Sequence, residues 1–69
     1  MAQHWSRFVS VSEKQAYALD KMAQDAGIGN GMDLLMKLTG YSRSKVGKMD
    51  SRSLRLVVDE AFKTYGKAR

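Results

Sequence analysis

Apolar residues recur at helical spacing in several stretches of this chain, separated by polar residues and glycines. A stripe of alanines with Leu19 predicts a helix over residues 13–26, and a short apolar run predicts another over residues 32–39. The last stretch predicts a helix over residues 51–65. Its expected buried stripe consists of Leu54, Val57, Val58, Ala61, Phe62 and Tyr65. With a short helical segment over residues 43–49, the pattern indicates an all-α fold, a compact three- to four-helix bundle.

Capping residues support the boundaries of these helices. Ser12 and Gln15 have the spacing of a capping box, and Gly27 is placed to end the first helix in a left-handed turn. Residues 27–31 are too rich in glycine for a helix and are expected to form a loop, with Ile28 as its anchor in the core. The other expected boundary residues are Gly40, Asp50 or Ser51, and Gly66.

The first ten residues carry two large aromatic side chains without helical periodicity. We therefore expect residues 1–10 to form an N-terminal arm and residues 11–69 to form a single helical domain. The arm either folds back, so that Trp5 and Phe8 cover a small core, or reaches out to a partner.

The composition argues against several classes of function. The chain of 69 residues has no Cys and a single His, His4, so neither a disulfide framework nor a metal site is expected. No paired carboxylates in an apolar setting and no Ser/His/Asp set are recognisable, so we expect no enzyme and no cofactor. No apolar run is long enough for a membrane span or a signal peptide, which predicts a cytoplasmic protein without a membrane partner.

The net charge of +5 is concentrated in the second half of the chain. Residues 1–36 hold three basic and four acidic residues, whereas residues 37–69 hold nine basic and three acidic residues. A concentrated positive surface attracts polyanions and binds phosphate backbones in a salt-dependent way. The second half is therefore predicted to face nucleic acid; the alternative is a merely solvated face.

Within the segment LLMKLTGYSRSKVGKM, residues 34–49, Gly40 is followed by Tyr41, by Ser42 and, six positions after the glycine, by Val46. This run resembles a helix-turn-helix motif. In that family a turn glycine ends the first helix, an apolar residue follows, a Ser or Thr caps the second helix, and a later apolar residue locks the two helices together. The glycine allows the positive φ of a tight turn, and Ser42 satisfies free amides of the new helix. Leu35 and Met49 are further apolar positions of the motif.

The resemblance implies that the second helix of the motif meets double-stranded DNA. The implied contacts are Ser42, Arg43, Ser44, Lys45 and Lys48, with Lys37, Arg52 and Arg55 on the phosphate backbone. Such side chains bind phosphates and base edges. The alternative is that residues 40–49 are an irregular basic linker between two core helices.

Two further segments resemble proteins of mobile genetic elements. Residues 11–15, VSEKQ, with the alanine-rich helix and Gly27 after them, are similar to small helical modules of phage and plasmid accessory proteins. Leu38-Thr39-Gly40, then Met49-Asp50 and the last helix, are similar to segments of phage GemA-type regulatory proteins. Both resemblances imply a small regulator of phage or plasmid origin.

Two hypotheses on function follow. The first is a DNA-binding regulator that acts as a homodimer on a two-fold site, with a dimer contact near Trp5 and Phe8. The second is a protein-binding inhibitor or adaptor that uses an aromatic and basic surface, with Trp5, Phe8 and Tyr41 as its candidate interface. Exposed, contiguous aromatics would favour the protein partner, whereas buried aromatics would leave the basic face as the working surface.

Overall fold

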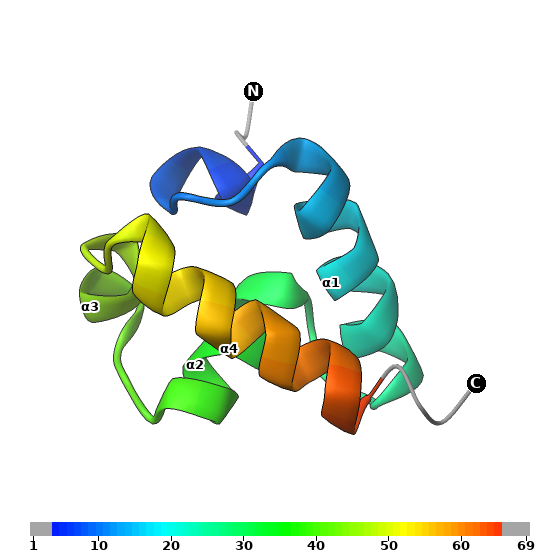
Figure 1. The fold of residues 1–69 in the computed structure, drawn as a ribbon. Helices are drawn as coiled ribbons and strands as arrows, with labels where there is room; N and C mark the ends of the chain where they lie inside the picture. Colours follow the sequence, from blue (N-terminus) through cyan, green and yellow to red (C-terminus); the bar gives the residue numbers. More distant parts are fainter. Residues whose placement is uncertain (1–3, 66–69) are drawn as a thin grey trace.

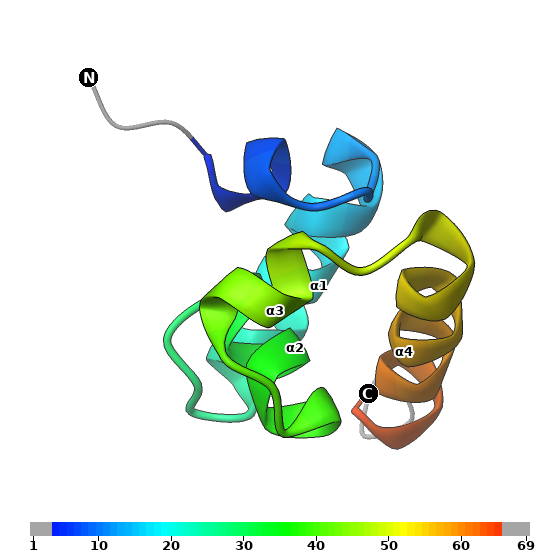
Figure 2. The same ribbon diagram turned by 90° about the vertical axis from the view of Figure 1, so that its left-hand side faces the viewer.

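The computed structural model describes residues 4–65, which form four α-helices, one short 3-10 helix and no strand (Figure 1). In chain order these are η1 (Trp5–Phe8), α1 (Glu13–Asp25), α2 (Gly31–Thr39), α3 (Arg43–Gly47) and α4 (Ser51–Thr64). α2 packs against all four other elements and so forms the centre of the bundle (Figure 2). The all-α bundle predicted from the hydrophobic pattern is confirmed. No helix within residues 4–65 has the length and apolarity needed to cross a membrane.

α1 begins and ends with the signals that its sequence predicts. The hydroxyl of Ser12 accepts a hydrogen bond from the Gln15 amide at 3.2 Å, and the Gln15 side chain accepts one from the Ser12 amide at 3.5 Å. At the other end Gly27 has a φ of 75°, and the Ile28 amide donates to the Ala23 carbonyl at 2.7 Å. A Schellman motif therefore ends the helix, and Ile28 packs against the core as predicted.

α2 begins at Gly31, one residue earlier than predicted, because Asn30 caps it. The side-chain oxygen of Asn30 accepts a hydrogen bond from the Asp33 amide at 2.9 Å. The prediction of a loop over residues 27–31 is therefore wrong for Gly31. A side chain at this position would collide with the ring of Trp5. Glycine thus lets the start of α2 approach η1 closely.

The turn between α2 and α3 has the predicted chemistry. Gly40 adopts a φ of 73° and donates its amide to the Met36 carbonyl at 2.8 Å. The hydroxyl of Ser42 accepts a hydrogen bond from the Lys45 amide at 3.3 Å and so caps α3. Val46 is fully buried and anchors the helix in the core. The segment after the turn is therefore a short helix and not an irregular linker.

α3 ends at Gly47, two residues before the predicted end. The amides of Lys48 and Met49 each donate, at 3.1 Å, to the carbonyl three residues back, on Lys45 and Val46. Such bonds tighten the last turn and end the helix. Lys48 therefore lies at the end of α3 and not within it.

α4 buries a narrower stripe than predicted. Its fully buried residues are Leu54, Val58 and Ala61. Val57 and Tyr65 are partly buried beside them, whereas Phe62 is 38% exposed, so its predicted place in the buried stripe is wrong. α4 packs mainly on α2, so only one line of its side chains is covered. The expected end of this helix at Gly66 falls outside the described residues.

The N-terminal segment packs onto the bundle through η1, although the sequence shows no helical periodicity there. The His4 side chain caps this short helix by accepting a hydrogen bond from the Ser6 amide at 3.3 Å. Trp5 is buried and joins the core, as the folding-back of the arm predicts. Phe8 remains 51% exposed and does not cover the core.

Candidate nucleic-acid interface

The polar side chains of α3 all project into solvent. Arg43, Ser44 and Lys45 are exposed, and so is Lys48 at the end of the helix. Val46 is the one fully buried side chain of α3, so this helix is attached to the core at a single point. The structure thus gathers four of the predicted DNA-reading residues around one short exposed helix.

The end of η1 lies beside α3 (Figure 2). Phe8 of η1 brings an aromatic ring to this helix. The guanidinium carbon of Arg43 lies 5.7 Å from the centre of the Phe8 ring, a cation–π contact. A Cβ on residue 47 would lie 3.1 Å from the Phe8 carbonyl oxygen, so glycine there permits the close approach of the two segments. The hollow between them is lined by Phe8, Met32, Arg43, Ser44 and Gly47.

A second cation–aromatic pair lies at the start of α3. The Nζ of Lys45 is 4.9 Å from the centre of the Tyr41 ring, and Tyr41 is 44% exposed. A neighbouring hollow is lined by Ser42, Ser44, Lys45, Lys48 and Met49. Because Ser44 lines both hollows, they belong to one continuous surface. We call it the α3 surface and define it by Phe8, Tyr41, Ser42, Arg43, Ser44, Lys45 and Lys48.

The α3 surface carries uncompensated positive charge. Residues 34–49 contain four basic residues and no acidic residue. Among the residues that the structure describes, Arg43, Lys45 and Lys48 form no ion pair. These cations are therefore available to the phosphate groups of a ligand.

The remaining predicted phosphate contacts lie apart from this surface. Lys37, Arg52 and Arg55 are exposed on α2 and α4. None of them lines the two hollows beside α3. Arg55 instead lines a hollow between α4 and the segment that leads into α1, next to Val11. The structure therefore brings together the predicted residues of α3 and its turn. Lys37, Arg52 and Arg55 lie outside this group.

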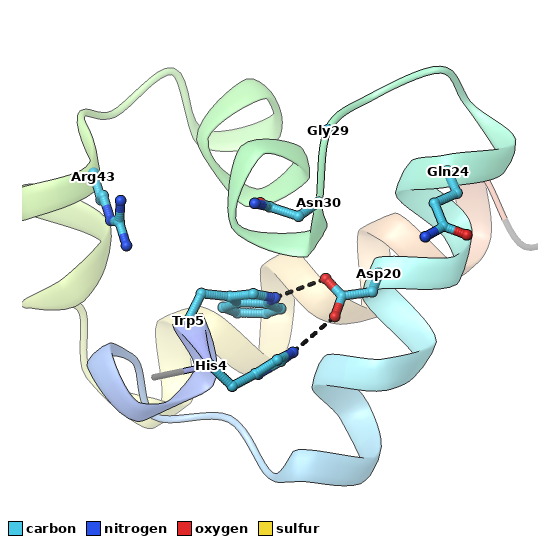
Figure 3. A pocket seen from close by; sticks show the side chains of 7 residues that line it. All are labelled: His4, Trp5, Asp20, Gln24, Gly29, Asn30 and Arg43. Carbon is cyan, nitrogen blue, oxygen red and sulfur yellow. Dashed lines mark hydrogen bonds and ion pairs between the residues drawn. The ribbon is translucent and has the colours of Figure 1, made fainter. Parts of the chain in front are cut away.

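The carboxylate of Asp20 holds η1, and with it Phe8, to the helices. Figure 3 shows its bonds to Trp5 and His4. One oxygen of Asp20 accepts hydrogen bonds from the Trp5 indole and from the Gly31 amide, both at 2.7 Å. The other oxygen lies 2.9 Å from Nε2 of His4. Since an ionised carboxylate only accepts hydrogen bonds, Nε2 of His4 carries the proton here. Asp20 thus ties together η1, α1 and the start of α2.

The environment of Asp20 favours its ionised form. Burial raises the pKa of this carboxyl, but the hydrogen bonds from Gly31, Trp5 and His4 act in the opposite direction. The net result is a pKa below the ordinary value for Asp. The folded structure therefore contains Asp20 in its ionised form at neutral pH.

Sequence reasoning missed this cluster. It considered His4 only as a single histidine without partners for a metal, and it assigned no role to Asp20. The signal is weak because Trp5 and Gly31 lie 15 and 11 residues from Asp20 along the chain, beyond any local spacing pattern. A polar residue directly beside the buried Leu19 was the only local hint.

The aromatic residues do not form the joint surface that a protein partner was expected to need. Trp5 is 7% exposed and is therefore removed from the candidate interface. Phe8 and Tyr41 are exposed, but each carries a cation over its ring. Phe8 and Tyr41 thus belong to the basic surface and do not form a separate apolar patch with Trp5.

Nothing within residues 4–65 resembles a metal centre, since no three His, Asp or Glu side chains lie together there in a suitable arrangement. Comparison of the chain with protein-family models, curated proteins and solved structures gave no match. The geometry and charge of the α3 surface are therefore the basis for a proposal on function.

Proposed function

We propose that this chain is a small DNA-binding regulator that contacts double-stranded DNA through the α3 surface, with α2 and α3 acting as a helix-turn-helix. The observation that carries the proposal is the set of exposed, unpaired cations on a short helix that a single side chain anchors. Gly40 and Ser42 form a short turn with a left-handed glycine between α2 and α3, as in such a motif.

The length of α3 limits what it reads. Its five residues rise by about 7.5 Å, which corresponds to roughly two base-pair steps of about 3.4 Å. Arg43 and Lys45 would contact base edges or phosphates, and Ser44 and Lys48 would contact phosphates beside them. Phosphate contacts therefore supply most of the affinity, and sequence discrimination is modest.

Phe8 and Tyr41 add an apolar component to this contact. When Arg43 or Lys45 leaves its aromatic ring for a phosphate, the ring becomes free to touch a sugar or a thymine methyl group. The exposed cations Lys37, Arg52 and Arg55 lie outside the hollows of the α3 surface and act through long-range attraction of the duplex. A DNA-binding role places the chain in the cytoplasm, and the resemblance to mobile-element proteins favours a phage or plasmid regulator.

A protein-binding inhibitor or adaptor is the second candidate. It is favoured by the exposure of Phe8, Tyr41 and Leu56, which are large apolar side chains at the surface. It would use the same cations to bind an acidic protein. The salt dependence of DNA binding distinguishes the two functions.

The first test is the affinity for a random-sequence duplex, measured by fluorescence anisotropy over a series of salt concentrations. Wild type is expected to bind, and its log K is expected to fall linearly with log salt. In the double variant Arg43→Ala/Lys45→Ala, the loss of two phosphate contacts would reduce that slope by about 2 and weaken binding at every salt concentration.

The matched control is Lys14→Ala/Lys21→Ala, which removes the same net charge from exposed positions of α1. This control is expected to keep the wild-type slope. Equal losses in both double variants would mean that net charge alone drives binding. Absence of binding at low salt would overturn the proposal and favour the protein-binding function.

A further inference from the structure

The outer side of α4 exposes a large apolar residue. Leu56 is 67% exposed, although α4 buries three other apolar side chains completely. A hollow of about 470 Å³ beside it is lined by Thr39, Tyr41, Met49, Ser53, Leu56 and Val57. α4 lies at the edge of the bundle, and none of the other helices that the structure describes crosses its outer side (Figures 1 and 2).

Two opposite charges flank Leu56 symmetrically on this side of the helix. Arg52 and Glu60 are each four residues away from it, so they share its side of α4 and lie about 6 Å before and after it. Both are exposed. They lie about 12 Å apart along the axis, too far to pair with each other. Within residues 4–65 neither forms an ion pair.

Opposite charges occupy the two halves of α4. Arg52 and Arg55 lie in its first half, and Asp59 and Glu60 lie in its second half, with Lys63 in the last turn. Arg52 and Glu60 are of opposite sign and lie at equal distances from Leu56, so the side of α4 that carries them complements a second α4 that runs in the opposite direction.

We propose that this side of α4 is a homodimer interface, in which α4 of two copies pairs antiparallel about a two-fold axis through Leu56. We call Arg52, Leu56 and Glu60 the α4 face. In this arrangement Arg52 of each copy meets Glu60 of the other, and the two Leu56 side chains meet at the centre. The hollow beside Leu56 of each copy then lies next to this contact. Such an interface is self-complementary, as two-fold symmetry requires.

A second copy of this chain fits the α4 face better than DNA or an unrelated partner. Asp59 and Glu60 would repel a phosphate backbone, whereas the two-fold operation pairs every charge of the α4 face with its opposite. The dimer contact expected near Trp5 and Phe8 is disfavoured, because Trp5 is buried. The interface does not depend on the proposed DNA binding. If both hold, the dimer carries two α3 surfaces.

The state of association of the wild-type chain is the first measurement, by sedimentation velocity without DNA. The α4 face is small, so we expect a dimer with a dissociation constant in the micromolar range, visible between about 10 µM and about 1 mM protein. Leu56→Ser removes the apolar centre and is expected to weaken the dimer at least about tenfold. Leu56 is exposed, so the variant keeps the wild-type circular dichroism.

A charge exchange tests the pairing itself. Arg52→Glu and Glu60→Arg each place like charges opposite one another and are expected to be monomeric when alone. An equimolar mixture of these two variants has both opposite-charge pairs again, so it forms a heterodimer. The double variant Arg52→Glu/Glu60→Arg likewise restores self-association. No effect confined to one molecule would produce this pattern.

Several results would overturn the interface. One is a wild-type chain that stays monomeric at about 1 mM, since an interface weaker than that would not form a specific dimer. Another is a dimer that persists unchanged in Arg52→Glu and Glu60→Arg, which would place the contact on a different face. A mixture of the two single variants that remains monomeric would likewise exclude the antiparallel pairing.

Discussion

At the scale of single residues, Asp20 joins segments that lie far apart along the chain. One carboxylate on α1 receives hydrogen bonds from His4 and Trp5 at the start of η1 and from Gly31 at the start of α2. These bonds keep η1 beside α3 and thereby place Phe8 in the α3 surface. A side chain outside the proposed interface therefore determines part of its shape.

Replacement of Asp20 by Asn is expected to lower the free energy of unfolding by about 2 kcal/mol, because hydrogen bonds to a charged group contribute about that much. The folded-state pKa of Asp20 is lowered, so the folded protein binds fewer protons than the unfolded chain as the pH falls. Its stabilisation is present above the unfolded pKa and is lost as the pH falls through the folded pKa. Urea unfolding of wild type between about pH 5 and pH 2 should show a steeper loss of stability than that of Asp20→Asn.

Asp59→Asn is a suitable control, since Asp59 is exposed on α4 and forms no ion pair within residues 4–65. It should follow the wild-type pH dependence. Equal pH profiles for wild type and Asp20→Asn would show that the Asp20 bonds do not stabilise the fold.

The role of a residue was predictable from the sequence where its partners lie within a few residues along the chain. The cap of α1 by Ser12, the left-handed glycines and the cap of α3 by Ser42 all depend on neighbours three or four residues away, and each prediction is confirmed. The exposure of Phe62 depends on how much of α4 the other helices cover, which no local pattern encodes. For the same reason, the sequence did not single out Leu56.

At the scale of elements, α3 is the least self-sufficient helix. It has five residues, one buried side chain and a cap supplied by Ser42. A helix of this length is not stable by itself, so its cap and its anchor determine whether it forms.

Ser42→Ala is expected to lower the free energy of unfolding by about 1 kcal/mol, because it leaves the Lys45 amide without its cap. Ser44→Ala is the matched control, an exposed serine in the same helix whose hydroxyl caps nothing. The control should change stability by less than about 0.5 kcal/mol. Equal stabilities in urea would mean that the Ser42 cap does not support α3.

The boundaries of the elements were predicted to within two residues, and the deviations have local causes. α2 starts early because Asn30 caps it and because Trp5 leaves room for no side chain at residue 31. α3 stops early because its last amides bond three residues back. Capping by Asn30 was visible in the sequence, but the run of glycines around it indicated a loop.

At the scale of the whole molecule, the bundle is small and has its centre at α2. The core contains residues from every described helix, and Trp5 of η1 belongs to it. A chain of this size usually unfolds in one cooperative step. The sequence predicted the class of fold, but the central place of α2 follows from contacts between distant segments.

Trp5 is the single tryptophan of the chain, so its fluorescence reports on η1 alone. Because it is 7% exposed and packs in the core, its emission should shift to the red in the same urea range in which the helices unfold. The two transitions, followed by fluorescence and by far-ultraviolet circular dichroism, are expected to coincide. A fluorescence change at clearly lower urea would show that η1 detaches before the bundle unfolds.

Val46 is the one fully buried side chain of α3, and this affects how binding preferences change as the sequence evolves. The side chains at positions 43, 44, 45 and 48 are exposed and outside the core, so mutation changes them with little loss of stability. Relatives of this chain can therefore diverge in what they bind while keeping the same scaffold. A library randomised at these four positions would have the same property in the laboratory, and selection from it could retarget the protein.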